Sequence, residues 1–211
     1  MLLSLSRIGK ISYFLLAGCL LLGCISSNTP ATKFYVLNPL DPGESLLKDT
    51  DPKEPLSLEV ASLRLPQYLE RPQIVTRSTG NRLELAEFHQ WGGNLRKNMM
   101  RVLAKNLSQL LATPNVFLSP HQPRTPPDFR IDIEVMKFER DPDGKVRLSV
   151  QWILSRGQDR KPLITQMTDL TGQEEQTESD LETTVSSMSA LMGELSVIIS
   201  REILKTLHEQ A

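Results

Sequence analysis

The stretch FRIDIEVMKFERDPDGKVRLSVQWIL, residues 129–154, decides the fold class of this chain. In its first half apolar residues alternate with charged ones, and in its second half they alternate with arginine, serine and glutamine. A period of two is typical of a β-strand that buries one face. Residues 141–144, Asp-Pro-Asp-Gly, are turn formers. The stretch therefore predicts two antiparallel strands joined by a short turn, with a bulge near Met136, where the alternation changes phase.

Other short apolar or alternating runs predict six further strands. They are residues 34–37, 56–60, 73–77, 82–87, 116–118 and 162–172. Residues 56–60 alternate in the manner of a half-buried strand. Residues 78–81, Ser-Thr-Gly-Asn, separate two strand-like runs and predict a hairpin.

Two helices complete the pattern. Residues 95–110 carry apolar side chains at helical spacing, with Asn106 among them, and Asn94 is the expected N-cap. Ser179 precedes Glu182 by three residues, which is the capping-box spacing, and an apolar stripe follows to Leu207. The order predicts an α/β fold: a single domain with a mixed β-sheet and two main helices packed on it.

The beginning of the chain has the features of a secretory signal. Arg7 and Lys10 precede residues 11–25, which carry no charge. As a helix this run reaches about 22 Å, which is short for a hydrocarbon core of roughly 30 Å. Positive start, apolar run and small-residue boundary match a signal peptide. Because each of the two cysteines follows a glycine in LLAGCLLLGC, residues 15–24, we interpret the signal as that of a bacterial lipoprotein.

Either cysteine could carry the lipid. Cys19 follows the better local consensus, but cleavage there leaves a short apolar run and a mature start rich in leucine. Cleavage before Cys24 leaves a polar start, so Cys24 is preferred and Cys19 is the alternative. We therefore expect a signal peptide at residues 1–23, a tether at 24–33 and a domain at 34–211. With no other cysteine in the chain, that domain has no thiol for a disulfide or a metal.

Composition and motifs argue against catalysis and nucleic-acid binding. The chain has 24 basic and 25 acidic residues, so it lacks a basic footprint for nucleic acid. Its basic cluster on residues 96–105 is interpreted as a solvated helix face. His89, His121 and His208 are far apart and have no second ligand at metal-site spacing. We expect no catalytic residue, cofactor or metal.

Three residues in the segment 66–91 are candidates for a partner interface. Tyr68, Arg71 and Trp91 are of the types enriched at interface hot spots. The alternative is that Trp91 packs in the core and Arg71 pairs with a nearby acid.

Several segments together resemble the PqiC/YmbA-like family of ABC-transport auxiliary lipoproteins. They are FYVLNPL (34–40), YLERPQIVTRSTGNRLELAEFHQWGGNLRKNMMRVLAKNL (68–107) and SSMSALMGELSVIISREIL (186–204). One departure is Gly92-Gly93, where better helix formers are expected, so the start of the first helix is open.

This resemblance implies a small α/β fold, similar to the anticodon-binding or TolB N-terminal type. It also implies a non-catalytic lipoprotein that faces the periplasm from the outer membrane. The partners it implies are an MCE-domain protein and an inner-membrane ABC permease and ATPase that together move lipids, and relatives can form homo-oligomeric rings. The alternative function is a stand-alone lipoprotein that binds lipid or a cell-envelope polymer.

Overall fold

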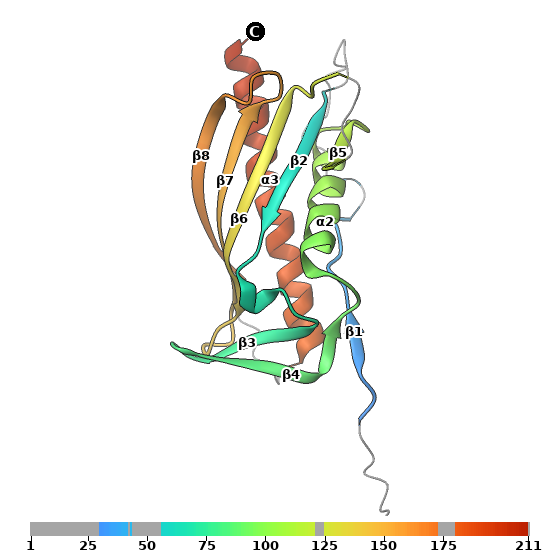
Figure 1. Cartoon of the computed structure of the whole chain (residues 1–211), viewed down its shortest axis with the longest axis vertical. Helices are drawn as coiled ribbons and strands as arrows, with labels where there is room; N and C mark the ends of the chain where they lie inside the picture. Colours follow the sequence, from blue (N-terminus) through green and yellow to red (C-terminus); the bar gives the residue numbers. More distant parts are fainter. Residues whose placement is uncertain (1–29, 42, 44–55, 121–124, 173–179, 211) are drawn as a thin grey trace, which may run out of the picture. The chain divides into compact units, whose positions relative to one another are not determined.

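The computed structural model describes residues 30–41, 43, 56–120, 125–172 and 180–210. Residues Thr32–Ala211 form one compact unit. Its described part contains a mixed eight-stranded sheet and two helices (Figure 1). The predicted single α/β domain is confirmed. Both candidate lipidation sites, Cys24 and Cys19, lie outside the described residues.

The elements follow the predicted order. The strands are β1 (Lys33–Tyr35), β2 (Leu58–Arg64), β3 (Gln73–Thr79), β4 (Arg82–Trp91), β5 (Val116–Leu118), β6 (Phe129–Arg140), β7 (Val146–Arg156) and β8 (Pro162–Thr171). The helices are α2 (Leu95–Leu110), α3 (Leu181–Gln210) and the short 3₁₀ turn η1 (Gln67–Leu69).

The sheet has a main part and an extension. In the main part the strands lie in the order β8-β7-β6-β2-β5. The extension is β3-β4-β1, and β3 joins the end of β6 through a pairing of Thr76 with Arg140. Figure 1 shows β3 and β4 crossing the lower end of the main strands, with β1 beside the end of β4. The extension contains much of the segment in which the interface candidates lie.

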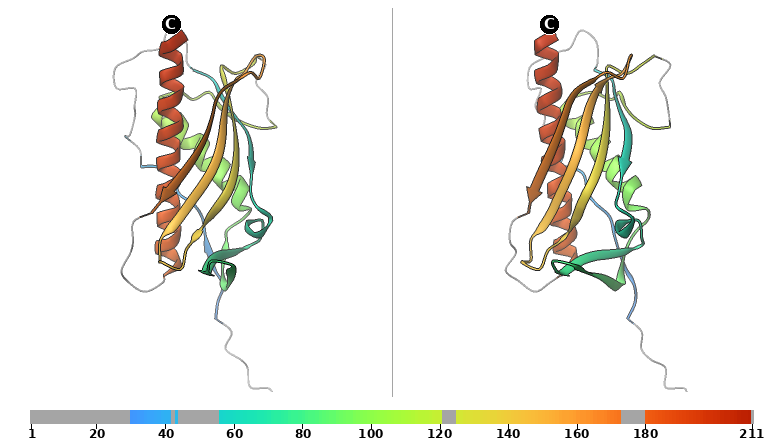
Figure 2. Two further views of the ribbon diagram at one scale, coloured as in Figure 1. Left: turned by 90° about the vertical axis from the view of Figure 1, so that its left-hand side faces the viewer. Right: turned by 60° about the vertical axis from the view of Figure 1, so that its left-hand side comes forward.

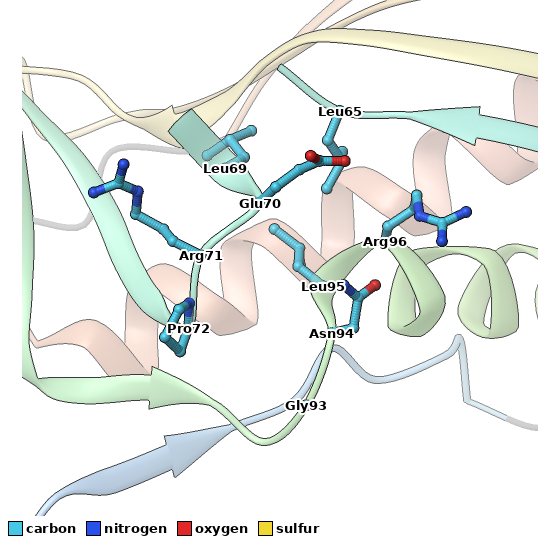
Figure 3. A pocket seen from close by; sticks show the side chains of 9 residues that line it. All are labelled: Leu65, Leu69, Glu70, Arg71, Pro72, Gly93, Asn94, Leu95 and Arg96. Carbon is cyan, nitrogen blue, oxygen red and sulfur yellow. The ribbon is translucent and has the colours of Figure 1, made fainter. Parts of the chain in front are cut away.

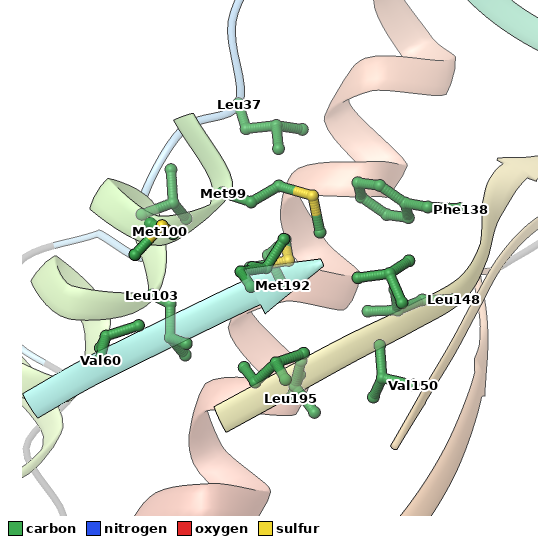
Figure 4. Packing of buried hydrophobic residues seen from close by; sticks show 14 of the residues in the cluster. Leu37, Val60, Met99, Met100, Leu103, Phe138, Leu148, Val150, Met192 and Leu195 are labelled. Atoms are coloured by element: carbon green, nitrogen blue, oxygen red, sulfur yellow. The ribbon is translucent and has the colours of Figure 1, made fainter. Parts of the chain in front are cut away.

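Both helices cover the same face of the sheet (Figure 2). Helix α3 contacts β6, β7 and β8, while α2 contacts β2 and β5 and packs against α3. The core between the sheet and the helices consists of the inward-facing apolar side chains of the strands and the apolar stripes of the helices. Figure 4 shows part of this core. Its largest fully buried side chains include Trp152 and Phe138. The opposite sheet face carries most of the polar strand residues, as expected for a sheet with one covered face.

The register of β6 confirms one expectation and the burial of β2 corrects another. The pairing of β6 with β7 shifts between Val135 and Lys137, which places the predicted bulge at Met136. The half-buried character predicted for residues 56–60 is wrong, because Glu59 is only 5% exposed. Strand β2 is central, and Arg130 of the neighbouring strand covers this carboxylate with a contact of 3.1 Å.

The N-cap of α2 shows where this helix begins after β4. Strand β4 runs to Trp91, beyond the predicted end at residue 87, and the Asn94 side chain accepts a hydrogen bond from Lys97 N at 3.0 Å. The two glycines therefore precede the helix, and the predicted N-cap is confirmed. At α3, Asp180 accepts from Glu182 N at 3.2 Å, whereas Ser179 of the predicted capping box lies outside the described residues.

Candidate interaction site

A buried carboxylate joins the extension to the main sheet. Glu139 of β6 is fully buried and accepts hydrogen bonds from two guanidinium nitrogens of Arg77, at 3.0 and 2.7 Å. It also accepts from the Tyr68 hydroxyl at 2.8 Å and from Phe138 N at 3.0 Å. Four donors on one carboxylate compensate much of its desolvation. The cluster fixes η1 and β3 against the end of β6.

This environment shifts the ionisation of both partners of Glu139. Burial and the hydrogen bond to Glu139 raise the pKa of Tyr68 above its ordinary value of 10.0. The hydrogen bond to Glu139 likewise raises the pKa of Arg77. At neutral pH the pair is therefore a phenol and a guanidinium that both donate to the carboxylate. This arrangement holds the three groups in place, as a structural ion pair does.

A second set of charges surrounds the first at the β6–β7 turn. Asp141 accepts hydrogen bonds from Lys137 at 2.7 Å and from Arg147 at 2.6 Å, and Arg147 also contacts Asp143. Arg77 lies 3.9 Å from Asp141, so the two sets form one network. Its position at the junction of β3, β6 and β7 sets the orientation of the extension relative to the main sheet.

Beside this network, η1 and the start of α2 enclose a cleft of about 200 Å³. Figure 3 shows Leu65, Leu69 and Leu95 around it, with Arg71 and Arg96 extending to opposite sides. Arg71 is exposed, and among the described residues no ion pair involves it. The cleft thus combines three leucines with two arginines, and Glu70 and Asn94 also line it.

The three interface candidates therefore occupy different environments. Trp91 is 5% exposed and belongs to the core, as its alternative interpretation stated. Tyr68 is half-buried and its hydroxyl is engaged by Glu139. Of the three, only Arg71 is exposed, and the described residues include no acidic partner of the kind that its alternative required. The geometry brings Tyr68 and Arg71 onto neighbouring positions of one turn, and their role at a partner interface stays a prediction.

The residues after β1 form a strap, residues 36–40, held along α2. Asn98 accepts from Leu37 N at 2.7 Å, and Asn106 accepts from Leu40 N at 2.8 Å. Asn106 is fully buried and donates to Ser196 of α3 at 3.0 Å. Side chains of both helices therefore replace the strand partner that this extended segment lacks.

Two glycines make room for the strap. A Cβ on Gly92 would lie 3.2 Å from Val36 Cγ1, and Gly92 N donates to Tyr35 O at 2.7 Å. A Cβ on Gly193 of α3 would lie 2.5 Å from Leu40 Cδ2. The departure at Gly92 thus has a packing reason, because the first residues of the domain pass close to the β4–α2 junction.

The two histidines that the structure describes, His89 and His208, each contact a nearby protein group. His89 stacks on Tyr35, with ring centroids 5.6 Å apart, and its Nδ1 lies 2.7 Å from the hydroxyl. His208 contacts Leu204 O within α3, and His121 lies outside the described residues. Within the described part, no group of three His, Cys, Asp or Glu side chains is placed to hold a metal ion. Nor does that part contain a helix whose length and apolar character would let it cross a bilayer.

The chain matches one known protein family over most of its length. The model of the ABC-type transport auxiliary lipoprotein component matches residues 35–200, which span the strap, the extension, the main sheet and most of α3. The chain belongs to this family. A search of curated proteins gives no match.

Two solved structures show a fold similar to that of this chain. A protein of Xanthomonas campestris, XCC0632, superposes with a TM-score of 0.68 at 14% identity, covering 85% of this chain and 98% of its own. An uncharacterized protein superposes with a TM-score of 0.65 at 19% identity, covering 82% and 99%. PelC of Paraburkholderia phytofirmans, crystallised as a dodecamer, gives a TM-score of only 0.38 at 12% identity, with coverages of 75% and 92%. The first two likenesses show that this fold recurs in solved structures, and the third is too weak for an argument about assembly.

Several residues of the site escaped prediction. Glu139 belongs to a strand that was predicted correctly, but the bulge at Met136 changes the phase, so that Phe138 faces the core and Glu139 the opposite face of the sheet. There Arg77 and Tyr68, from far along the chain, cover it. Asn106 gave a signal, because it is a polar residue within an apolar helical stripe. Asn98 gave none.

Proposed function

We propose that this chain is a non-catalytic lipoprotein subunit of an MCE/ABC-type lipid transport system. Its lipid anchor at Cys24 holds it at the outer membrane, and its domain receives the periplasmic MCE component. The observation that carries the proposal is the family match over residues 35–200, which covers nearly the whole domain. The candidate surface for the MCE component is the exposed part of η1, with Tyr68 and Arg71.

The geometry of the domain supports a binding role. The polar groups of Tyr68, Arg77 and Glu139 bond to one another and fix the extension, so these groups have a structural role, and only the exposed part of the Tyr68 ring is open to a partner. Three clefts among the described residues measure about 200, 280 and 330 Å³, and each is lined by charged as well as apolar side chains. Sites for small molecules usually occupy about 300–1,000 Å³ and are mostly apolar. The alternative, a stand-alone lipoprotein that binds lipid in a large apolar pocket, has no support from these clefts.

The test is affinity purification of the full-length, tagged protein from its native membranes, with identification of co-eluting proteins and lipids. Co-elution of an MCE-domain protein and an ABC permease supports the proposal. Co-elution of lipid or envelope polymer without those proteins favours the alternative. Arg71→Glu should weaken the association with the MCE component, whereas Arg160→Glu, at the exposed turn between β7 and β8, should leave it unchanged.

The anchor is tested with matched cysteine variants. Cys24→Ala should block lipidation and yield a soluble or unprocessed protein, because it removes the thiol that carries the lipid in this proposal. Cys19→Ala should be processed and retained normally. Mass spectrometry of the mature protein identifies the modified residue. Normal retention of Cys24→Ala together with loss of Cys19→Ala would move the anchor to the alternative site.

A further inference from the structure

Helix α2 carries an unusual row of charge. Its sequence contains Arg96, Lys97, Arg101 and Lys105 and no acidic residue. Lys97, Arg101 and Lys105 are four residues apart, so they share one helix face, and all three are exposed. This row was interpreted from the sequence as an ordinary solvated helix face.

The structure shows that this row lacks the compensation that such faces usually have. Like charges at i and i+4 destabilise a helix, and a cation in the first turn opposes the helix dipole. Among the described residues no ion pair joins Lys97, Arg101 or Lys105 to an acid. On the sheet, by contrast, Arg64 and Arg130 each contact a carboxylate of a neighbouring strand. A row placed at a cost to its own helix points to an anionic partner.

Exposed apolar side chains lie next to the row. The strap runs along α2, because it is bonded to Asn98 and Asn106, which follow Lys97 and Lys105 by one residue. Phe34 of β1, just before the strap, is 66% exposed, and Val36 of the strap is 53% exposed. Figure 1 shows β1, which contains Phe34, beside the junction of β4 and α2.

A cleft of about 280 Å³ connects the two features. Tyr35, Val36 and Trp91 line it together with Lys97 and Arg101, the charged residues among the described part of its lining. Burial and, after it, the charges of Asp180 and Glu182 raise the pKa of Tyr35.

We propose that the basic–apolar face, formed by Phe34, Val36, Lys97, Arg101 and Lys105, binds the surface of an anionic phospholipid bilayer. Exposed apolar side chains beside unpaired cations match the two layers of such a surface, the acyl boundary and the phosphates. The inference rests on the proposed anchor, since Phe34 follows Cys24 by about ten residues. Ten residues reach at most about 35 Å when fully extended, so the anchor keeps this face close to the bilayer.

This contact orients the domain. With α2 and β1 against the lipid, the uncovered face of the sheet and the turn η1 remain available to protein partners. An acyl anchor alone would leave the orientation free, whereas the second contact restricts it.

The experiment uses the full lipidated chain reconstituted in vesicles of phosphatidylethanolamine and phosphatidylglycerol (3:1) with brominated acyl chains. Phe34→Trp places a fluorophore on the face, and Met167→Trp, at a 50% exposed position on β8, is the matched control. The native Trp91 and Trp152 are 5% and 0% exposed and supply a background that the unsubstituted protein measures. The bromolipid should quench the tryptophan at position 34 and leave that at position 167 unquenched.

Charge reversal tests the electrostatic part. Lys97→Glu/Arg101→Glu should lower the equilibrium ratio of molecules whose basic–apolar face is bound to lipid to those whose face is free by about 25-fold. Each basic group near an anionic surface contributes about fivefold to this ratio. The control is Arg201→Glu/Lys205→Glu, an exposed pair with the same spacing on α3, which should change nothing. In pure phosphatidylcholine vesicles the difference between the two double variants should disappear.

The outcomes separate this inference from the proposed function. Protein that floats with the vesicles but shows no quenching at position 34 overturns the inference and leaves the anchor intact. Protein that does not float at all overturns the anchor. Absence of quenching in vesicles, with protection of position 34 from acrylamide only when other proteins of native membranes are present, overturns the inference in favour of an acidic protein partner.

Discussion

Removal of Arg77 tests whether the cluster at Glu139 is a buried ion pair or a surface one. The Arg77 side chain is 21% exposed and that of Glu139 is fully buried. Arg77→Met leaves the carboxylate with the Tyr68 hydroxyl and one backbone N–H as donors. Breaking a buried pair on one side costs about 3–5 kcal/mol, whereas exposed pairs contribute about 0–1 kcal/mol. Since two donors remain, we expect a loss near 3 kcal/mol.

The matched control is Arg64→Met. Arg64 contacts Glu134 at 2.9 Å with side chains that are 71% and 48% exposed, so its loss should cost less than about 1 kcal/mol. The double variant Arg77→Met/Glu139→Gln removes the stranded charge as well as its partner. It should therefore be less destabilised than the sum of its single variants, by about 2 kcal/mol.

Urea unfolding followed by circular dichroism at pH 7 measures these free energies. Amide exchange should locate the effect of Arg77→Met in β3, β4 and η1. Equal losses for Arg77→Met and Arg64→Met would refute the reasoning, because they would show that Glu139 is solvated in solution. Additive single variants would refute the coupling.

Two further predictions concern Tyr68 and the strap. Because the pKa of Tyr68 is raised, its phenol keeps its proton in the folded state at pH values where the unfolded chain has lost it, so the free energy of unfolding should fall as pH rises above about 10. Tyr68→Phe should flatten this decline in urea titrations at pH 8 to 11. An unchanged slope would contradict the prediction. Asn106→Ala removes a buried side chain that bonds the strap at 2.8 Å and Ser196 at 3.0 Å, so it should lower the free energy of unfolding by about 3 kcal/mol and increase proteolysis near Leu40. The control, Asn81→Ala at the exposed β3–β4 turn, should cost less than about 0.5 kcal/mol. Equal midpoints of urea denaturation for the two variants would contradict this prediction.

Local periodicity was sufficient to predict most of the fold. Residues 129–154 alternate because each strand of this hairpin buries one face, and that property is written in consecutive residues. The start of α2 was predicted from Asn94 for the same reason, since a cap acts within three residues. The bulge at Met136 was visible as a change of phase.

Long-range partners account for what the sequence did not predict. Glu59 was expected on a half-exposed strand, but Arg130 covers it, 71 residues later in the chain. The cluster of Tyr68, Arg77 and Glu139 has the same origin, because it joins a turn, a strand of the extension and a strand of the main sheet. Pairings of this kind depend on topology, which periodicity does not encode.

The strap also determines how the domain responds to mechanical load. Strand β1 lies parallel to β4, and the segment that follows is bonded to Asn98 and Asn106 in turn. A pull applied through residue 32 acts along the axis of this segment and roughly across its hydrogen bonds. Under this load the hydrogen bonds are sheared and must break together, because the direction of the force does not let them break one after another. Such an attachment resists tension best when the force comes from its N-terminal end.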